Sequence, residues 1–407
     1  MQPAAGLAAG VYRGALALNF PRDNTSRLVS LLAVIATPPR LPLAEAGPLA
    51  LSGEEPAQTG CAATRLLPVF SLLGANFNAS AAWPTPIEVN VVDDCGVAMR
   101  TGNVTATFSN NDPPLSLLPQ ADGRWSGTWA PRNARTPALT VTATARQPDR
   151  NLEGAAEVGG NLAANPEVPI LGVNGVVSNA SFSTTAQPSP GEMVAIYGER
   201  LSDEPPGEFT LAPTLPLPPQ LRNTTITLAG RPLPLFYTGQ GQIAAVIPYD
   251  IPQRAIHQMV ARRGNRLSVP EPVTVMPAQP AVFPYGSNPR GQGVIQVFKS
   301  GTEFFLNDSN KPAAIGDVLV IYCTGLGPVT PPVAAGAAAT SSRTVNAVTV
   351  TIGGRTANVD YAGLTAGLAG LYQINTRVPP DVAPGDEVSV VVTVAGFASV
   401  PVTMAVR

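Results

Sequence analysis

The chain has 407 residues, of which 13% are charged, and its formal net charge is −2. So little charge excludes a charge-rich disordered chain and the basic surface that binds nucleic acid. The single histidine, His257, argues against histidine-based metal sites and Ser-His-Asp triads. The 38 glycines and 44 prolines break helices, so the composition predicts an all-β protein of short strands and many turns.

The N-terminal part predicts two strands, because residues 12–20 and 27–39 are apolar or alternate in polarity. Two strands do not make an independent sandwich. We therefore expect residues 1–39 to be the closing strands of a module that begins upstream, together with any export signal. Residues 40–60 are polar and spaced by proline and glycine, which is typical of a linker. No run of 18 apolar residues predicts a membrane helix.

Residues 61–165 predict an Ig-like β-sandwich. Segments of alternating polarity recur there and end at Asp, Asn, Gly or Pro turns, which is the spacing of such a fold. These segments are residues 86–96, 102–114, 123–131 and 138–146.

Two cysteines, Cys61 and Cys95, fall in this module, 34 residues apart. A disulfide between them would suit an exported protein, and the alternative is a pair of buried free thiols. The third cysteine, Cys323, lies in the apolar run "VLVIYC" and is expected to be an inert buried thiol.

The module also contains all three tryptophans of the chain, Trp83, Trp125 and Trp129. Trp125 and Trp129 are four residues apart and therefore lie on one face of a strand. They either pack in the core or form, with Trp83, a platform on which sugars stack.

Three aspartates of the module, Asp93, Asp94 and Asp112, are either turn residues or calcium ligands. Turn formation is the commoner use of such residues, so no metal site is predicted.

The C-terminal half contains an internal duplication. The segment "PGEMVAIYGERL" at 190–201 matches "IGDVLVIYCTGL" at 315–326, and "ITLAGRPLPLFYTG" at 226–239 matches "VTIGGRTANVDYAG" at 350–363. "QIAAVIP" at 242–248 matches "QINTRVP" at 373–379 after a seven-residue insertion, and "EPVTVMPA" at 271–278 is aligned with "VPVTMAVR" at 400–407. A repeat this long indicates two duplicated domains, residues 170–278 and 279–407, and not a solenoid.

The duplication decides how "GDVLVIYCTGLGPVTPP" at 316–332 is read. A phosphate-binding loop would lead into a helix, but proline follows in both copies. The first copy has Gly198 at the position of Cys323, so the repeat does not preserve a cysteine nucleophile. Both segments are therefore predicted to be strands that run into turns, with Tyr197 and Tyr322 on equivalent faces.

Two hairpins are expected to turn at Ala229-Gly230 and at Gly353-Gly354, because such pairs supply the positive φ of a two-residue turn. Arg231 and Arg355 follow these turns and are expected to be solvated. The insertion at 364–370 is expected to be a loop that gives the second copy an interaction which the first lacks.

The motifs "GVVSNASFSTTAQPSPGEMVAIYGERL" (175–201), "PLFYTGQGQIAAVIP" (234–248), "GDVLVIYCTGLGPVTPP" (316–332) and "GLYQINTRVPPDVAPGD" (370–386) resemble the Solibacter-type uncharacterised C-terminal domain. "SNASF" and Ala244 depart from the family pattern. The segment that begins at Cys61 is similar to Ig-like modules that accompany this domain, and "GLAAGVYRGALALNF" (6–20) resembles a BACON-like module. The resemblance implies an exported modular β-protein and no reaction.

Three functions follow as hypotheses. The first is a non-enzymatic secreted or cell-surface protein with structural, docking or adhesion roles, which needs no cofactor and has a protein or polysaccharide of the envelope or extracellular matrix as partner. The second is a carbohydrate-binding module that uses the tryptophans with Tyr237, Tyr361 and Tyr372. The third and most remote is a glycosidase based on carboxylates alone. No catalytic residue is predicted.

Overall fold

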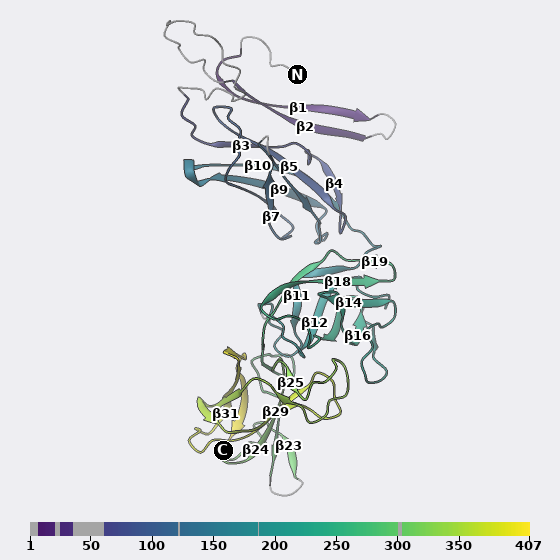
Figure 1. Ribbon diagram of the computed structural model, residues 1–407, viewed down its shortest axis with the longest axis vertical. Helices are drawn as coiled ribbons and strands as arrows, with labels where there is room; N and C mark the ends of the chain where they lie inside the picture. Colours follow the sequence, from purple (N-terminus) through teal and green to yellow (C-terminus); the bar gives the residue numbers. More distant parts are fainter. Residues whose placement is uncertain (1–6, 21–24, 36–60, 121–122, 186, 300–302) are drawn as a thin grey trace. The chain divides into compact units, whose positions relative to one another are not determined.

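The computed structural model describes residues 7–20, 25–35, 61–120, 123–185, 187–299 and 303–407 (Figure 1). The predicted linker at 40–60 lies outside these residues. The described part contains strands, turns and one 3₁₀ turn, Pro148–Arg150, and it has no helix long and apolar enough to cross a membrane. The chain divides into two compact units, Met1–Asn165 and Pro166–Arg407.

The first unit begins with an antiparallel hairpin of β1 (Gly10–Phe20) and β2 (Thr25–Ile35). It continues with the Ig-like module, in which β7 pairs with both β8 and β6 and so joins two sheets. The strands are β3 (Leu66–Phe70), β4 (Phe77–Ser80), β5 (Thr85–Asp93), β6 (Asn103–Phe108), β7 (Leu115–Pro119), β8 (Arg124–Trp129), β9 (Ala138–Gln147) and β10 (Leu152–Ala163).

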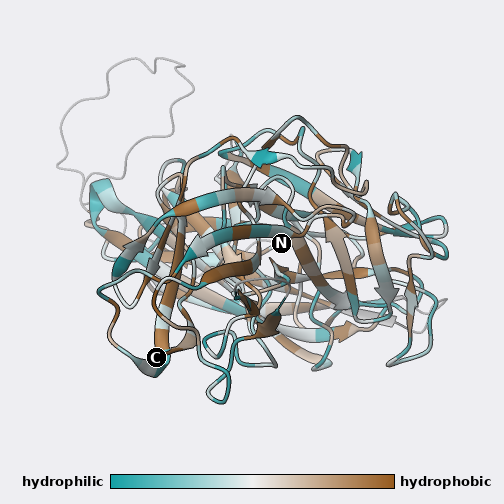
Figure 2. Ribbon diagram, turned by 90° about the horizontal axis from the view of Figure 1, so that it is seen from below, coloured by the Kyte–Doolittle hydropathy of each residue, from teal (hydrophilic) through white to brown (hydrophobic). Residues whose placement is uncertain are grey.

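The module's core follows from the alternation of its strands. In β5 and β9 every second side chain is buried, so Ile87, Val89 and Val91 meet Val141 and Ala143 between the sheets. Burial of such side chains contributes about 25 cal/mol for each Å² of apolar surface removed from water. In Figure 2 most brown, hydrophobic residues accordingly lie on strands.

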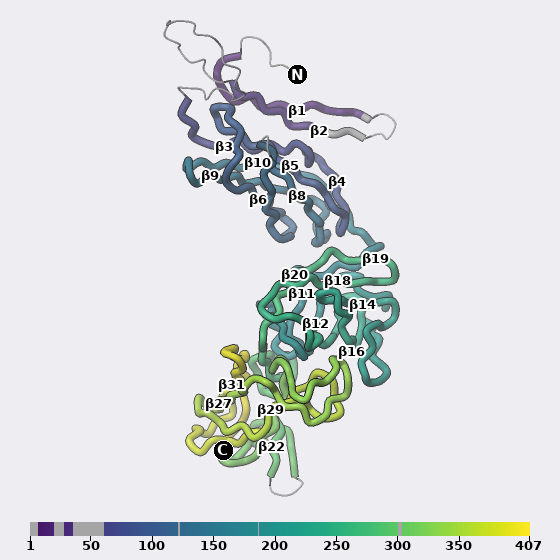
Figure 3. The backbone as a smooth tube through the Cα atoms, in the orientation of Figure 1, coloured from purple at the N-terminus to yellow at the C-terminus, as the bar shows by residue number. Residues whose placement is uncertain are grey.

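The second unit contains two β-sandwiches, which are formed by consecutive parts of the chain (Figure 3). The first has a sheet of order β11-β12-β17-β16-β13 and a second sheet built on β14 and β18. Its strands are β11 (Ile170–Ser178), β12 (Met193–Glu199), β13 (Phe209–Leu211), β14 (Thr224–Leu228), β15 (Arg231–Pro232), β16 (Leu235–Gly239), β17 (Gln242–Val246), β18 (Ala255–Arg263), β19 (Arg266–Leu267) and β20 (Glu271–Val275).

The second sandwich repeats this plan around β24 and β30 in one sheet and β27 and β31 in the other. Its strands are β21 (Ala281–Val282), β22 (Ile295–Phe298), β23 (Phe304–Leu306), β24 (Val318–Thr324), β25 (Val329–Thr330), β26 (Arg343–Thr344), β27 (Val348–Ile352), β28 (Arg355–Ala357), β29 (Val359–Leu364), β30 (Tyr372–Arg377), β31 (Gly385–Val394), β32 (Phe397–Ala398) and β33 (Val402–Val406).

Strand pairing shows that the two sandwiches are copies of one plan. Tyr197 of β12 pairs with Gln242 of β17, and Tyr322 of β24 pairs with Gln373 of β30. The β16–β17 ladder has an irregularity between Leu235 and Tyr237, and the β29–β30 ladder has one between Val359 and Tyr361. The equivalence of "VAIYG" and "VLVIYC", predicted from the sequence, is confirmed.

The two predicted hairpins are present. Leu228 pairs with Arg231 across Ala229-Gly230, and Ile352 pairs with Arg355 across Gly353-Gly354. All four turn residues have positive φ, as a two-residue turn of this type requires.

The alignment of the last strands needs a correction of two residues. Glu271 pairs with Met259 in the first copy, and Val402 pairs with Val390 at the same place in the second. The equivalent segments are therefore 271–275 and 402–406, and aligning 271–278 with 400–407 was wrong. The error arose because both segments contain the letters "PVT", which the alignment matched. A shift of two residues leaves the same side chains buried, because side chains of a strand alternate between its faces with period two.

The insertion in the second copy is a loop between β29 and β30, as predicted. Ala369 of this loop is buried against Leu217 and Val246 of the first sandwich, and a side chain on Gly370 would meet Met193 at 3.0 Å. The loop of the second copy therefore packs against the first copy.

Candidate functional site

The structure does not form the tryptophan platform considered above. Trp125 and Trp129 do lie on one face of β8, but that face is the core, where they are 2% and 3% exposed. Trp125 donates from Nε1 to the carbonyl oxygen of Met99 at 3.1 Å, and Phe108 stacks on Trp129 with 4.6 Å between ring centroids. Trp83 alone is exposed. The core-packing alternative is correct for two of the three rings.

The aspartates of the Ig-like module accept hydrogen bonds from the backbone, Asp93 within the turn that follows β5 and Asp94 and Asp112 from segments distant in the sequence. Asp112 is buried and accepts hydrogen bonds from Trp129 Nε1 and from the backbone N–H groups of Arg132 and Asn133. Such bonds satisfy the carboxylate without a cation. No group of three or more potential ligands that could hold a metal occurs in the described ranges.

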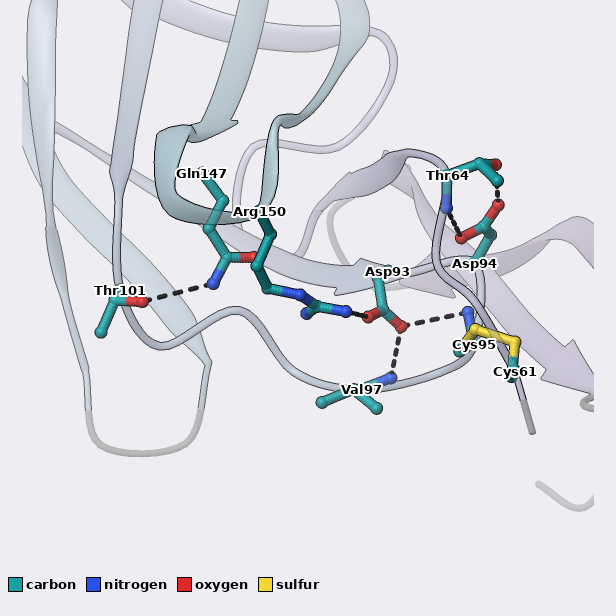
Figure 4. Close-up of polar contacts among 9 residues, drawn as sticks. All are labelled: Cys61, Thr64, Asp93, Asp94, Cys95, Val97, Thr101, Gln147 and Arg150. Atoms are coloured by element: carbon teal, nitrogen blue, oxygen red, sulfur yellow. Dashed lines mark hydrogen bonds and ion pairs between the residues drawn. A yellow bond between two sulfur atoms is a disulfide. The ribbon is translucent and has the colours of Figure 1, made fainter. Parts of the chain in front are cut away.

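Asp93 and Asp94 belong to a corner tied by the Cys61–Cys95 disulfide, whose Cα atoms are 5.9 Å apart (Figure 4). Asp93 accepts from the N–H groups of Cys95 and Val97 and pairs with Arg150 at 3.0 Å. The disulfide predicted from the sequence is present and fits an oxidising environment.

Cys323 is fully buried, and this burial raises the pKa of its thiol far above the ordinary value. It is therefore an unreactive thiol, as predicted. The glycines that follow it end a strand: Gly325 and Gly327 have positive φ, and a side chain on Gly325 would lie 1.9 Å from the carbonyl oxygen of Gln279.

A surface that could bind a partner lies on the outer side of the first sandwich, and we call its four residues, Tyr197, Phe209, Tyr237 and Gln242, the tyrosine face. Val194 and Ile196 of β12 point into the core, so Tyr197 points outward.

The four side chains of the tyrosine face lie together. Gln242 donates from Nε2 to the Tyr237 hydroxyl at 2.7 Å, and Phe209 meets Tyr237 edge to face with 5.2 Å between ring centroids. Tyr197 is 39% exposed and Phe209 is 52% exposed. Burial, and next the neighbouring Tyr197, raise the pKa of Tyr237, so its hydroxyl is neutral at physiological pH. The face is thus uncharged and offers aromatic rings beside amide and phenol groups.

The second copy carries a charged version of this arrangement. Arg343 pairs with Gly363 as Phe209 pairs with Gly239, and its guanidinium carbon lies 4.9 Å from the ring centroid of Tyr361. Tyr361 directs its hydroxyl to the carbonyl oxygens of Ser342 and Leu364. A guanidinium therefore lies over Tyr361 where the first copy has the ring of Phe209 beside Tyr237, so the second copy presents a cation at this place and the first presents an aromatic ring.

Sequence reasoning named Tyr237 among possible sugar-binding rings but missed its neighbours. Tyr372, named with it, is fully buried, and the guanidinium of Arg343 lies over Tyr361. The equivalence of Tyr197 and Tyr322 could have indicated an outward face. Phe209 gave no signal, because its short strand falls in a segment that the repeat does not match.

No protein-family model matches the sequence, and no curated protein matches it. A Bacteroides ovatus mixed-linkage glucan utilization locus protein, SGBP-B, in complex with a heptasaccharide is 13% identical over 89% of this chain and 71% of its own, with a TM-score of 0.34. An I-band fragment of titin is 9% identical over 84% of this chain and 98% of its own, with a TM-score of 0.16. Fibronectin(III)-like modules of Clostridium thermocellum CbhA are 11% identical over 52% of this chain and 93% of their own, with a TM-score of 0.17.

Scores this low carry no argument about function. The strands described above define a modular, all-β protein of Ig-like sandwiches.

Proposed function

We propose that the chain is part of an exported, non-enzymatic protein that docks onto a neutral polysaccharide of the cell envelope or extracellular matrix, and that residues 170–407 form a Solibacter-type C-terminal domain. The disulfide supports export, because such bonds persist in oxidising compartments. The motifs quoted above support the family.

The observation that carries the docking role is the tyrosine face. Rings with exposed faces stack on the C–H groups of sugars, and neighbouring amide and phenol groups hydrogen-bond to sugar hydroxyls. None of the four side chains carries a charge, which favours a neutral over an anionic chain. The docking and carbohydrate-binding hypotheses thus become one: the site is on the first C-terminal sandwich and not on the tryptophans.

Affinity electrophoresis of the full chain through gels with xylan, glucomannan or mixed-linkage β-glucan tests the proposal. We expect retardation in at least one neutral polysaccharide and none in anionic polygalacturonate. Tyr237→Ala should weaken binding about tenfold, which is the effect of about 1.4 kcal/mol lost with one stacking ring.

Tyr361→Ala is the matched control, because a positive charge, that of Arg343, lies over the equivalent ring of the second copy and replaces the uncharged face of the first. It should leave the retardation unchanged. Migration unaffected by every neutral polysaccharide, or binding that survives Tyr237→Ala combined with Phe209→Ala, would contradict the proposal.

A further inference from the structure

The turn before β12 is covered by the second sandwich at close range. A side chain on Gly191 would lie 2.2 Å from the hydroxyl oxygen of Tyr372, which belongs to the second sandwich, and 2.3 Å from a ring carbon of Tyr249, which belongs to the first. The N–H of Met193 donates across the contact to Thr324 Oγ1 at 2.9 Å. The two sandwiches therefore meet in a tight joint.

Glu192 lies within this joint and is fully buried. Its Oε2 accepts from the Ser189 N–H at 2.8 Å and from the Ser189 hydroxyl at 3.2 Å, whereas Oε1 has no hydrogen-bond partner. The second sandwich reaches this carboxyl, because a side chain on Gly325 would lie 3.3 Å from its Cδ.

The titratable groups that face Glu192 supply no positive charge. Tyr372 of β30 interacts with Glu192, and Tyr249 after β17 and Cys323 of β24 interact in turn with Tyr372. Burial raises the pKa of all three, so they are neutral. No ion pair joins Glu192 to a cation in the described part of the chain. Burial raises the pKa of Glu192 to about 8, against the opposing effect of the hydrogen bonds from Ser189.

The second copy has the same turn without the cover. Asp317 stands at the place of Glu192 and accepts from the Ala314 N–H at 2.8 Å, but it also pairs with Lys299 at 3.0 Å and keeps some exposure. A carboxylate that caps this turn therefore does not require burial. What distinguishes Glu192 is that a second sandwich closes over it.

We propose that the contact between the two C-terminal sandwiches is a pH-sensitive joint, which is closed while Glu192 carries a proton and weakens when that proton is lost. A carboxylate without a counter-charge is strongly disfavoured inside a protein, and separating the sandwiches would hydrate it. Between about pH 4.5, where an exposed Glu titrates, and about pH 8, each pH unit favours the open form by up to tenfold, and the effect levels off above pH 8.

Hydroxyl-radical footprinting of the full chain between pH 5 and pH 9.5, read by mass spectrometry, tests the joint. Labelling of Met193 and Tyr372 should rise several-fold from pH 5 to pH 8 and then level off. Met259 and Met404 are fully buried, one in each sandwich core, and should stay unlabelled, because only the contact opens.

Two variants complete the test. Glu192→Gln should keep Met193 and Tyr372 at their pH 5 labelling throughout, and Asp317→Asn, its counterpart in the second copy, should leave the wild-type profile unchanged. A flat wild-type profile overturns the proposal without any variant, as does labelling of Met259 and Met404 in parallel with Tyr372, which would mean unfolding of the whole sandwich.

Discussion

Single residues of the two copies differ in what surrounds them, although they occupy the same place in the fold. Gly191 and Gly316 both precede the turn carboxylate, and their φ angles are 78° and 84°. Gly191 faces Tyr372 and Tyr249, whereas a side chain on Gly316 would meet nothing within 4 Å. Alanine at position 316 would therefore strain only the backbone, whereas alanine at position 191 would strain the backbone and also clash with the side chains packed at the joint.

Gly316→Ala should lower the free energy of unfolding of the second unit by about 1 kcal/mol, the cost of placing alanine in the left-handed region. Gly191→Ala should cost at least about 2 kcal/mol more, because overpacking adds to that strain. Urea unfolding followed by circular dichroism measures both. Equal losses in the two variants would show that the joint is not tightly packed at Gly191.

At the scale of elements, the disulfide joins the segments that flank β3 and β5, the two strands that pair directly. Closing a loop of this length stabilises a fold by roughly 3–4 kcal/mol in the chain-entropy model. All three tryptophans belong to this unit, so tryptophan fluorescence reports on the first unit alone.

We expect reduction, or the double substitution Cys61→Ser with Cys95→Ser, to lower the thermal midpoint seen by tryptophan fluorescence by about 10 °C or more. The unfolding of the second unit, seen by far-ultraviolet circular dichroism, should be unaffected, because Cys323 is free. An unchanged fluorescence midpoint would mean that the bond does not constrain the unfolded chain.

Strands and their equivalence were predictable because apolar alternation and turn residues are local signals. The glycine pairs at 229–230 and 353–354 fixed two hairpins, and the spacing of Trp125 and Trp129 fixed their common face. Whether that face was the core or the surface depends on which sheet covers it, and alternation does not encode this. The tyrosine face likewise brings Phe209 to Tyr237 through strand pairing that no local pattern reveals.

For the whole molecule, division into two units predicts two separable unfolding transitions. Only the second unit contains Glu192, whose pKa is raised to about 8. Between about pH 4.5 and pH 8 the folded unit holds a proton that the unfolded chain has lost, so the unfolded state binds fewer protons and the free energy of unfolding falls as pH rises. Below this range the contribution is fully present, and above it the loss is complete.

The total loss from this group is at most about 5 kcal/mol, since each pKa unit corresponds to about 1.4 kcal/mol. Denaturant unfolding at pH 5, 6.5 and 8 should therefore show the transition of the second unit, which is silent in tryptophan fluorescence, moving to lower denaturant with rising pH. Glu192→Gln should flatten this dependence while leaving the fluorescence transition in place. If the variant and the wild type shifted equally with pH, ionisation of Glu192 would not control the stability of the paired sandwiches.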